Sequence, residues 1–183
     1  MTRPVPAPDG GFVDARNRLQ PALLDRLSDD ARDERSEVDG MRTMTKAQLR
    51  HAVLRDLGAL FNAVQPLGAW AVENAHLHPH VAHSVLNFGL PALSGQLASA
   101  LDVQVLERAI RVAILRFEPR ILADTLQVRA LEASSVLDTH NVIEFEIRGH
   151  LWSQPVPLEI LLRTQLDLEV GQVEVTDAVA RGR

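Results

Sequence analysis

The positions of the hydrophobic residues divide the chain into a helical half and a strand half. From Thr45 to about Ala63, and again from Leu106 to Phe117, apolar side chains recur at the spacing of one helix face. The first helix should bury Leu49, Val53, Leu57, Leu60, Phe61 and Val64; the second should bury Leu106, Ile110, Ala113, Ile114 and Phe117. Thr45 and Gln48 have the spacing of a capping box, which predicts where the first helix begins.

After Arg120 the hydrophobic period changes from helical to alternating. The alternation predicts strands over Thr125–Ala130, Ile143–His150, Ile160–Leu166 and Val173–Val175. The second of these is the clearest, because Ile143, Phe145 and Ile147 alternate with charged residues. Helices followed by strands predict an α+β fold in which the helices pack on one face of a small antiparallel sheet.

The N-terminal residues differ in character from the rest of the chain. Residues 1–40 are predicted to be a disordered tail, 41–177 the folded domain, and 178–183 a loose C-terminus. Within 19–28 a short apolar island is expected to form a helix, with its apolar positions at Leu23, Leu24 and Leu27. This island either folds back on the domain or docks in a groove of a partner, and the sequence leaves both open.

A proline ends the second helix and creates a candidate site. Pro119 has no amide hydrogen and forces Glu118 out of the helical region, so that Glu118 and Arg120 flank a bend. A carboxylate and a guanidinium fixed there can bind a partner through charge-assisted hydrogen bonds. They can equally form an internal salt bridge that braces the corner, and the residues alone slightly favour the internal bridge.

The same tripeptide carries a resemblance to a known family. Glu118-Pro119-Arg120 at the end of an amphipathic helix resembles the signature of the small baseplate wedge proteins of contractile injection machines. That family includes a phage tail wedge subunit once labelled lysozyme-like, and TssE of the type VI secretion system. The upstream run Ser84–Gly95 is similar to a second family motif, with Phe88 where members often have Tyr. The resemblance runs from Leu19 to Val175.

The resemblance implies a structural adaptor with two binding surfaces. Glu118, Pro119 and Arg120 would dock on the wedge core formed by larger baseplate subunits. The second motif, with Asn87, Phe88 and Gly89, would help to shape this surface, although packing alone explains it nearly as well. The sheet would start sheath polymerisation by strand exchange, through strands that contain Ile143, Phe145, Ile147, Ile160 and Leu162.

Composition excludes some functions and leaves others. The chain has 183 residues, no cysteine and a net charge of -5, which argues against disulfides and against general nucleic-acid binding. It has no apolar run long enough for a membrane span, and no basic and apolar leader, so we expect neither membrane insertion nor a signal peptide. We expect a cytoplasmic protein, monomeric alone, that joins other wedge subunits and sheath proteins at a membrane-docked baseplate.

Catalysis and metal binding have weak support. Glycoside hydrolysis needs two carboxylates across a cleft, and no spacing selects a partner for Glu118, which Arg120 would keep charged. His76, His78, His80 and His83 surround Pro79, but alternate histidines do not define a tetrahedral site. We therefore expect no enzyme, no cofactor and no metal. A peptidoglycan hydrolase with Glu118 as the acid, or a regulatory binding module, remains as an alternative.

Overall fold

The computed structural model describes residues 22–23, 25, 44–67, 73–74, 76–93, 102–131, 142–153 and 155–178. Most of the predicted tail, its domain boundary and the C-terminal end lie outside these residues. In the described part, no helix is long and apolar enough to cross a membrane.

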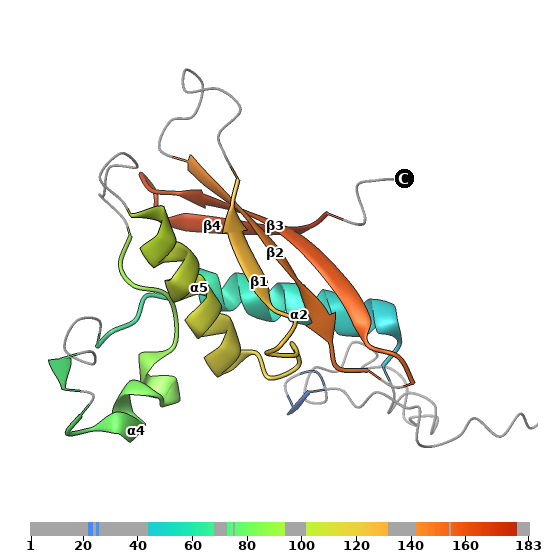
Figure 1. Ribbon diagram of the computed structural model, residues 1–183, viewed down its shortest axis with the longest axis horizontal. Helices are drawn as coiled ribbons and strands as arrows, with labels where there is room; N and C mark the ends of the chain where they lie inside the picture. The colour runs from blue at the N-terminus through green and yellow to red at the C-terminus, as the bar shows by residue number, and fades with distance from the viewer. Residues whose placement is uncertain are drawn as a thin grey trace, which may run out of the picture.

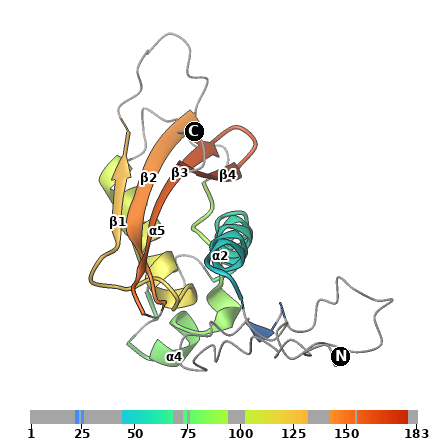
Figure 2. The same ribbon diagram turned by 90° about the vertical axis from the view of Figure 1, so that its right-hand side faces the viewer.

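Two longer helices and an antiparallel sheet build the domain, which confirms the predicted α+β class. The helices are α2 (Lys46–Phe61), the short α4 (Pro79–Ala82), the 3-10 turn η3 (Val85–Asn87) and α5 (Val103–Phe117). The strands are β1 (Gln127–Ala130), β2 (Val142–Leu151), β3 (Leu158–Asp167) and β4 (Gln172–Asp177), in the spatial order β1-β2-β3-β4. Figure 1 shows α2 and α5 beside the sheet, and Figures 1 and 2 both place α4 away from it.

The helix ends follow local sequence signals. The Thr45 hydroxyl accepts from the backbone N–H of Gln48, and the Gln48 side chain accepts from the backbone N–H of Thr45, which confirms the capping box. Asp102 caps α5 by accepting from the backbone N–H groups of Gln104 and Val105. The prediction for Val64 was wrong: α2 ends at Phe61, so that the Val64 side chain leaves the helix face and is 62% exposed.

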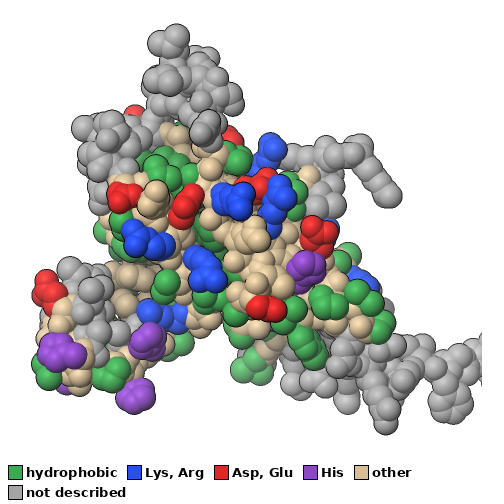
Figure 3. Space-filling view, in the orientation of Figure 1, with side chains coloured by type: hydrophobic (Ala, Val, Ile, Leu, Met, Phe, Trp, Pro, Cys, Tyr) green, Lys and Arg blue, Asp and Glu red, His purple; other side chains and the backbone are tan. Residues whose placement is uncertain are grey.

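One face of the sheet meets the helices and the other carries charge. The buried positions on the strands join the helix stripes in one core; they include Phe145, Ile147, Ile160, Leu162 and Leu166. On the opposite face Arg129, Glu146 and Arg163 lie side by side across β1, β2 and β3. Figure 3 shows acidic and basic side chains interspersed over this part of the molecule.

Candidate functional site

The end of α5 forms a corner in which Glu118 is buried. Glu118 is the C-cap residue, and its backbone N–H donates to the carbonyl of Ile114 at 2.8 Å. Its side chain is only 3% exposed, whereas Pro119 after it lies at the surface. A buried carboxylate needs donors, and this chain supplies them from the next turn.

Arg120 binds Glu118 at two points. Its Nε donates to Glu118 Oε1 at 2.7 Å and its Nη2 to Oε2 at 2.5 Å, while its backbone N–H donates to Oε1 at 3.1 Å. This planar two-point pairing is one that arginine makes and lysine does not. The hydrogen bonds that the Arg120 side chain donates to Glu118 are the main reason that the pKa of Arg120 is raised above its usual range, against the opposing effect of burial.

The pair extends into a chain of charges across α2. Arg120 Nη2 also binds Asp56 Oδ2 at 2.5 Å, and Asp56 Oδ1 lies 2.8 Å from Arg55 Nη2. Arg55 Nη2 in turn lies 2.7 Å from Asp25 Oδ1, so the N-terminal island contacts α2 at this residue. The side chain of Leu23 is 70% exposed. Leu24 and Leu27, the other predicted docking residues, lie outside the described residues.

The corner is also tied to the sheet. The carbonyl of Arg120 accepts from the backbone N–H of Trp152 at 2.8 Å, and Ile121 pairs with Leu151 in an antiparallel bridge. Trp152 directly follows β2 in the chain, and its indole is 56% exposed beside the corner. The corner thus joins α5, α2 and the end of β2.

The second motif lies against the first. The rings of Phe88 and Phe117 meet edge to face at 5.1 Å, directly before Glu118. Gly89 has φ +120°, and a Cβ there would lie 2.3 Å from the carbonyl oxygen of Ala63. Leu90 donates to that same oxygen at 2.9 Å, and Asn87 is buried. The run of residues 87–90 is therefore fitted to the end of α2, and the two motifs form one region.

Other predicted site residues lie elsewhere. Phe145, Ile147, Ile160 and Leu162 are at most 1% exposed in the core, and Ile143 is partly buried. Because the first four side chains are buried, they do not present a surface to a partner. All five residues belong to the two central strands, β2 and β3. His76, His78, His80 and His83 are exposed around α4 (Figure 3). Among the described residues no group of three His, Asp or Glu is placed to hold a metal.

Sequence reasoning missed Asp56 and Trp152. Asp56 gave no signal in the sequence, because an acidic residue on the outer side of a helix usually faces solvent. Its partner, Arg120, comes 64 positions later in the chain. Trp152 lies beyond the end of the clearest strand, in a segment read only as a connection. Tryptophan is enriched among the residues that contribute most to protein–protein interfaces.

These features define an α+β domain whose two sequence motifs meet at one charged corner. A family model described as Baseplate wedge protein gp25 matches residues 47–156, more than half of the chain. The chain belongs to this family of structural, non-enzymatic baseplate wedge proteins of contractile tail-like machines. The comparisons with curated proteins and with solved structures gave no match. The family assignment sets the hydrolase alternative aside.

Proposed function

We propose that this chain is a wedge subunit that docks on the wedge core through the corner at Glu118, Pro119 and Arg120. The observation that carries the proposal is that two separate motifs, around Phe88 and at Glu118, pack together at one corner. Both motifs lie inside the segment that matches the family.

In this proposal the charged residues of the corner have different roles. Glu118 is buried and bound by Arg120, so it fixes the shape of the corner rather than meeting the partner directly. Arg120 keeps 23% of its side chain exposed, and Pro119 and Trp152 flank it at the surface. A partner would bind the exposed part of this corner, with the buried part held rigid beforehand.

The finer assignments belong to the same proposal. The chain acts as a TssE-like subunit of a type VI secretion system, in the cytoplasm at a membrane-docked baseplate, and its sheet starts the sheath. It joins the machine as a monomer, with residues 41–177 as the wedge domain. The N-terminal island, with Leu23, Leu24 and Leu27, adds a second contact with a partner.

The test is a pull-down with purified wedge-core proteins and sheath protein, using wild type, Arg120→Ala and Glu118→Ala. Each variant is first checked for folding by circular dichroism, because Glu118 is buried. Parallel experiments with proteins of a type VI system and of a contractile phage decide between the two machines.

Capture of the wedge core by wild type and its loss in folded Arg120→Ala support the proposal. If folded variants bind as well as wild type, the corner is an internal brace only, and the docking role is wrong. The regulatory-module alternative predicts one soluble partner and no association with core or sheath.

A further inference from the structure

The charge chain at the corner ends in a carboxylate that comes from the N-terminal island. Arg120 pairs with Glu118 and with Asp56. Asp56 also pairs with Arg55, and Arg55 pairs with Asp25 of the island. Without Asp25, two carboxylates balance two guanidinium groups. Asp25 therefore adds a negative charge that the pairing of α2 with the end of α5 does not require.

Asp25 is bound at only one of its two carboxylate oxygens. Its Oδ1 lies 2.7 Å from Nη2 of Arg55, whereas its Oδ2 is buried and has no hydrogen-bond donor among the described residues. The Asp25 side chain is 12% exposed, so water reaches little of it. Burial of an oxygen without a donor opposes the contact, because the oxygen loses its hydrogen bonds with water and gains none. The contact between Asp25 and Arg55 is therefore easy to open.

Asp56 holds Arg55 in place independently of Asp25. The Nε and Nη2 of Arg55 both donate to Oδ1 of Asp56, at 2.9 and 2.8 Å, and these bonds do not involve the island. The Arg55 side chain is 42% exposed, whereas that of Arg120 is 23% exposed. A guanidinium that is already oriented but open to solvent can bind an incoming carboxylate without first being ordered.

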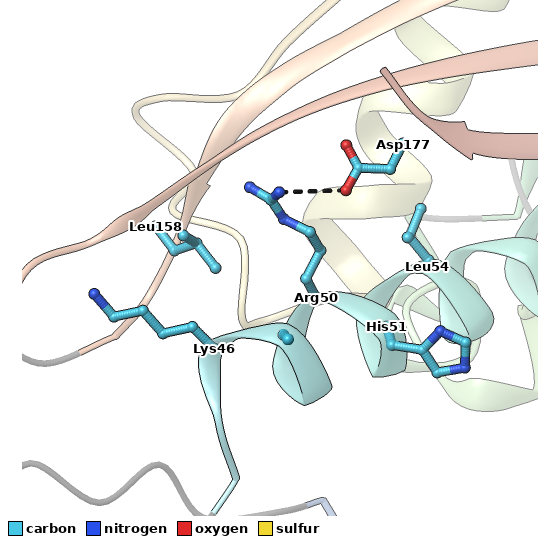
Figure 4. A pocket seen from close by; sticks show the side chains of 7 residues that line it. Lys46, Arg50, His51, Leu54, Leu158 and Asp177 are labelled. Atoms are coloured by element: carbon cyan, nitrogen blue, oxygen red, sulfur yellow. Dashed lines mark ion pairs between the residues drawn. The ribbon is translucent and has the colours of Figure 1, made fainter. Parts of the chain in front are cut away.

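A second arginine of α2 makes contacts of a different kind. Figure 4 shows Arg50 reaching from α2 toward Asp177 at the end of β4, with an ion pair of 3.3 Å. Arg50 Nη2 also donates to the carbonyl of Glu159, in β3, at 2.6 Å. Both partners belong to the sheet, so Arg50 joins α2 to the fold. Arg55 instead joins α2 to the island, whose Leu23 side chain is 70% exposed, so that the ion pair rather than burial of Leu23 holds the island there.

We propose that the ion pair between Asp25 and Arg55 is a latch. In the free subunit it holds the N-terminal island on α2, and an acidic side chain of the wedge core takes the place of Asp25 when the corner docks. The inference rests on the proposed docking function and adds Arg55 to the docking residues. The partner group is a carboxylate, because it replaces a carboxylate on a guanidinium. The exchange releases the island, which is then free to make its own contact with the core.

The latch and docking are linked because both use the same guanidinium. Any change that opens the latch in the free subunit raises the affinity for the wedge core, and docking favours the open latch by the same factor. A partly exposed ion pair contributes weakly, so opening this one should change the affinity by about two- to fivefold.

The first measurement detects the latch itself. The chain has no cysteine, so Leu23→Cys combined with His51→Cys carries two spin labels, one on the island and one on α2 a turn before Arg55. Double electron–electron resonance should give one narrow distance in the free protein. Asp25→Asn, and binding of purified wedge-core proteins, should each replace it with a broad distribution. Arg50→Gln is the matched control, because it removes an arginine charge from the same helix and should leave the distance unchanged.

The second measurement is the affinity for purified wedge-core proteins, by calorimetry, after circular dichroism has shown that each variant is folded. Asp25→Asn should bind about two- to fivefold more tightly than wild type. Arg55→Gln should bind about tenfold more weakly than Asp25→Asn, because the core carboxylate is left without its partner. In the Arg55→Gln background, Asp25→Asn should have no further effect, since the group for which the two carboxylates compete is gone.

The outcomes separate the two proposals. If wild type binds the wedge core but folded Asp25→Asn binds no more tightly, the latch inference is overturned while the docking function stands. An equal gain from Asp25→Asn in the Arg55→Gln background, or a spin-label distance that Asp25→Asn and the wedge core leave unchanged, also overturns it. If wild type binds no wedge core, the docking function itself is wrong and the inference falls with it.

Discussion

Arg120 pairs with Asp56 at 2.5 Å although the two residues lie 64 positions apart in the chain. The same guanidinium holds Glu118 at two points. Arg120 therefore joins the end of α5 to the outer side of α2, and the corner depends on a charge from each helix.

Removing the buried carboxylate of Glu118 should destabilise the domain more than removing the partly exposed carboxylate of Asp56. Glu118→Ala leaves Arg120 without its main partner and should lower the free energy of unfolding by about 2 kcal/mol. Asp56→Ala should cost about 0.5–1 kcal/mol, because Asp56 is 30% exposed and water replaces part of the pair. Urea unfolding followed by circular dichroism measures both.

The surface pair of Glu146 and Arg148 supplies the control. It has a single hydrogen bond of similar length, 2.7 Å between Arg148 Nε and Glu146 Oε1, and Arg148 is 60% exposed. Arg148→Ala should leave the midpoint of urea unfolding nearly unchanged, because water replaces an exposed ion pair. If Arg148→Ala lowered the free energy of unfolding as much as Glu118→Ala, burial would add nothing at the corner.

The contribution of Arg120 should not vary with pH across the neutral and moderately alkaline range. Its pKa in the folded protein is raised above its ordinary value, so its stabilising effect is complete below the ordinary value and is lost only as pH rises through the folded value. The difference in unfolding free energy between wild type and Arg120→Met should thus stay constant from about pH 7 to pH 11. A steady decrease within that range would contradict the assigned protonation state.

Sequence patterns predicted most of this fold because each element carried its own signal. The capping box at Thr45, the apolar stripe of α5 and the alternation of β2 are local features, and each is present as predicted. The bend at Pro119 and its internal pairing were also readable, since Glu118 and Arg120 are neighbours. The observed bounds differ from the predicted ones mostly at the ends of elements. α2 ends before Val64, which lies outside the core, and β1 begins at Gln127 instead of Thr125.

Contacts between distant elements gave no comparable signal. Asn62 is polar and follows a helix, which fits a loop as well as a cap on β4. Glu107 lies on the polar side of α5, and only the folded chain shows it bound to Ala130. Which strand forms an edge depends on the order β1-β2-β3-β4, and no residue spacing encodes this order.

The two glycines of α2 and of the second motif should respond to alanine in opposite directions. At Gly89 the backbone has φ +120° and a Cβ would lie 2.3 Å from the Ala63 carbonyl oxygen, so Gly89→Ala should cost about 1–3 kcal/mol of stability. At Gly58 a Cβ meets nothing within 4 Å, and Gly58→Ala should stabilise α2 by about 0.5–1 kcal/mol. Denaturant unfolding of both variants checks the pair, and equal effects would contradict the fitted contact at Gly89.

Trp152 should contribute to docking without contributing to folding. Its indole is 56% exposed, and its link to the corner is a backbone hydrogen bond to the Arg120 carbonyl, which Trp152→Ala retains. Stability should therefore change by no more than about 0.5 kcal/mol. Binding of purified wedge-core proteins, measured by calorimetry, should weaken by about ten- to a hundredfold, as for a central aromatic contact. Val170→Ala is the control. Val170 is 63% exposed, but it follows the end of β3, whereas Trp152 lies between β2 and the start of β3. Equal binding by the two variants would place the docking surface away from this corner.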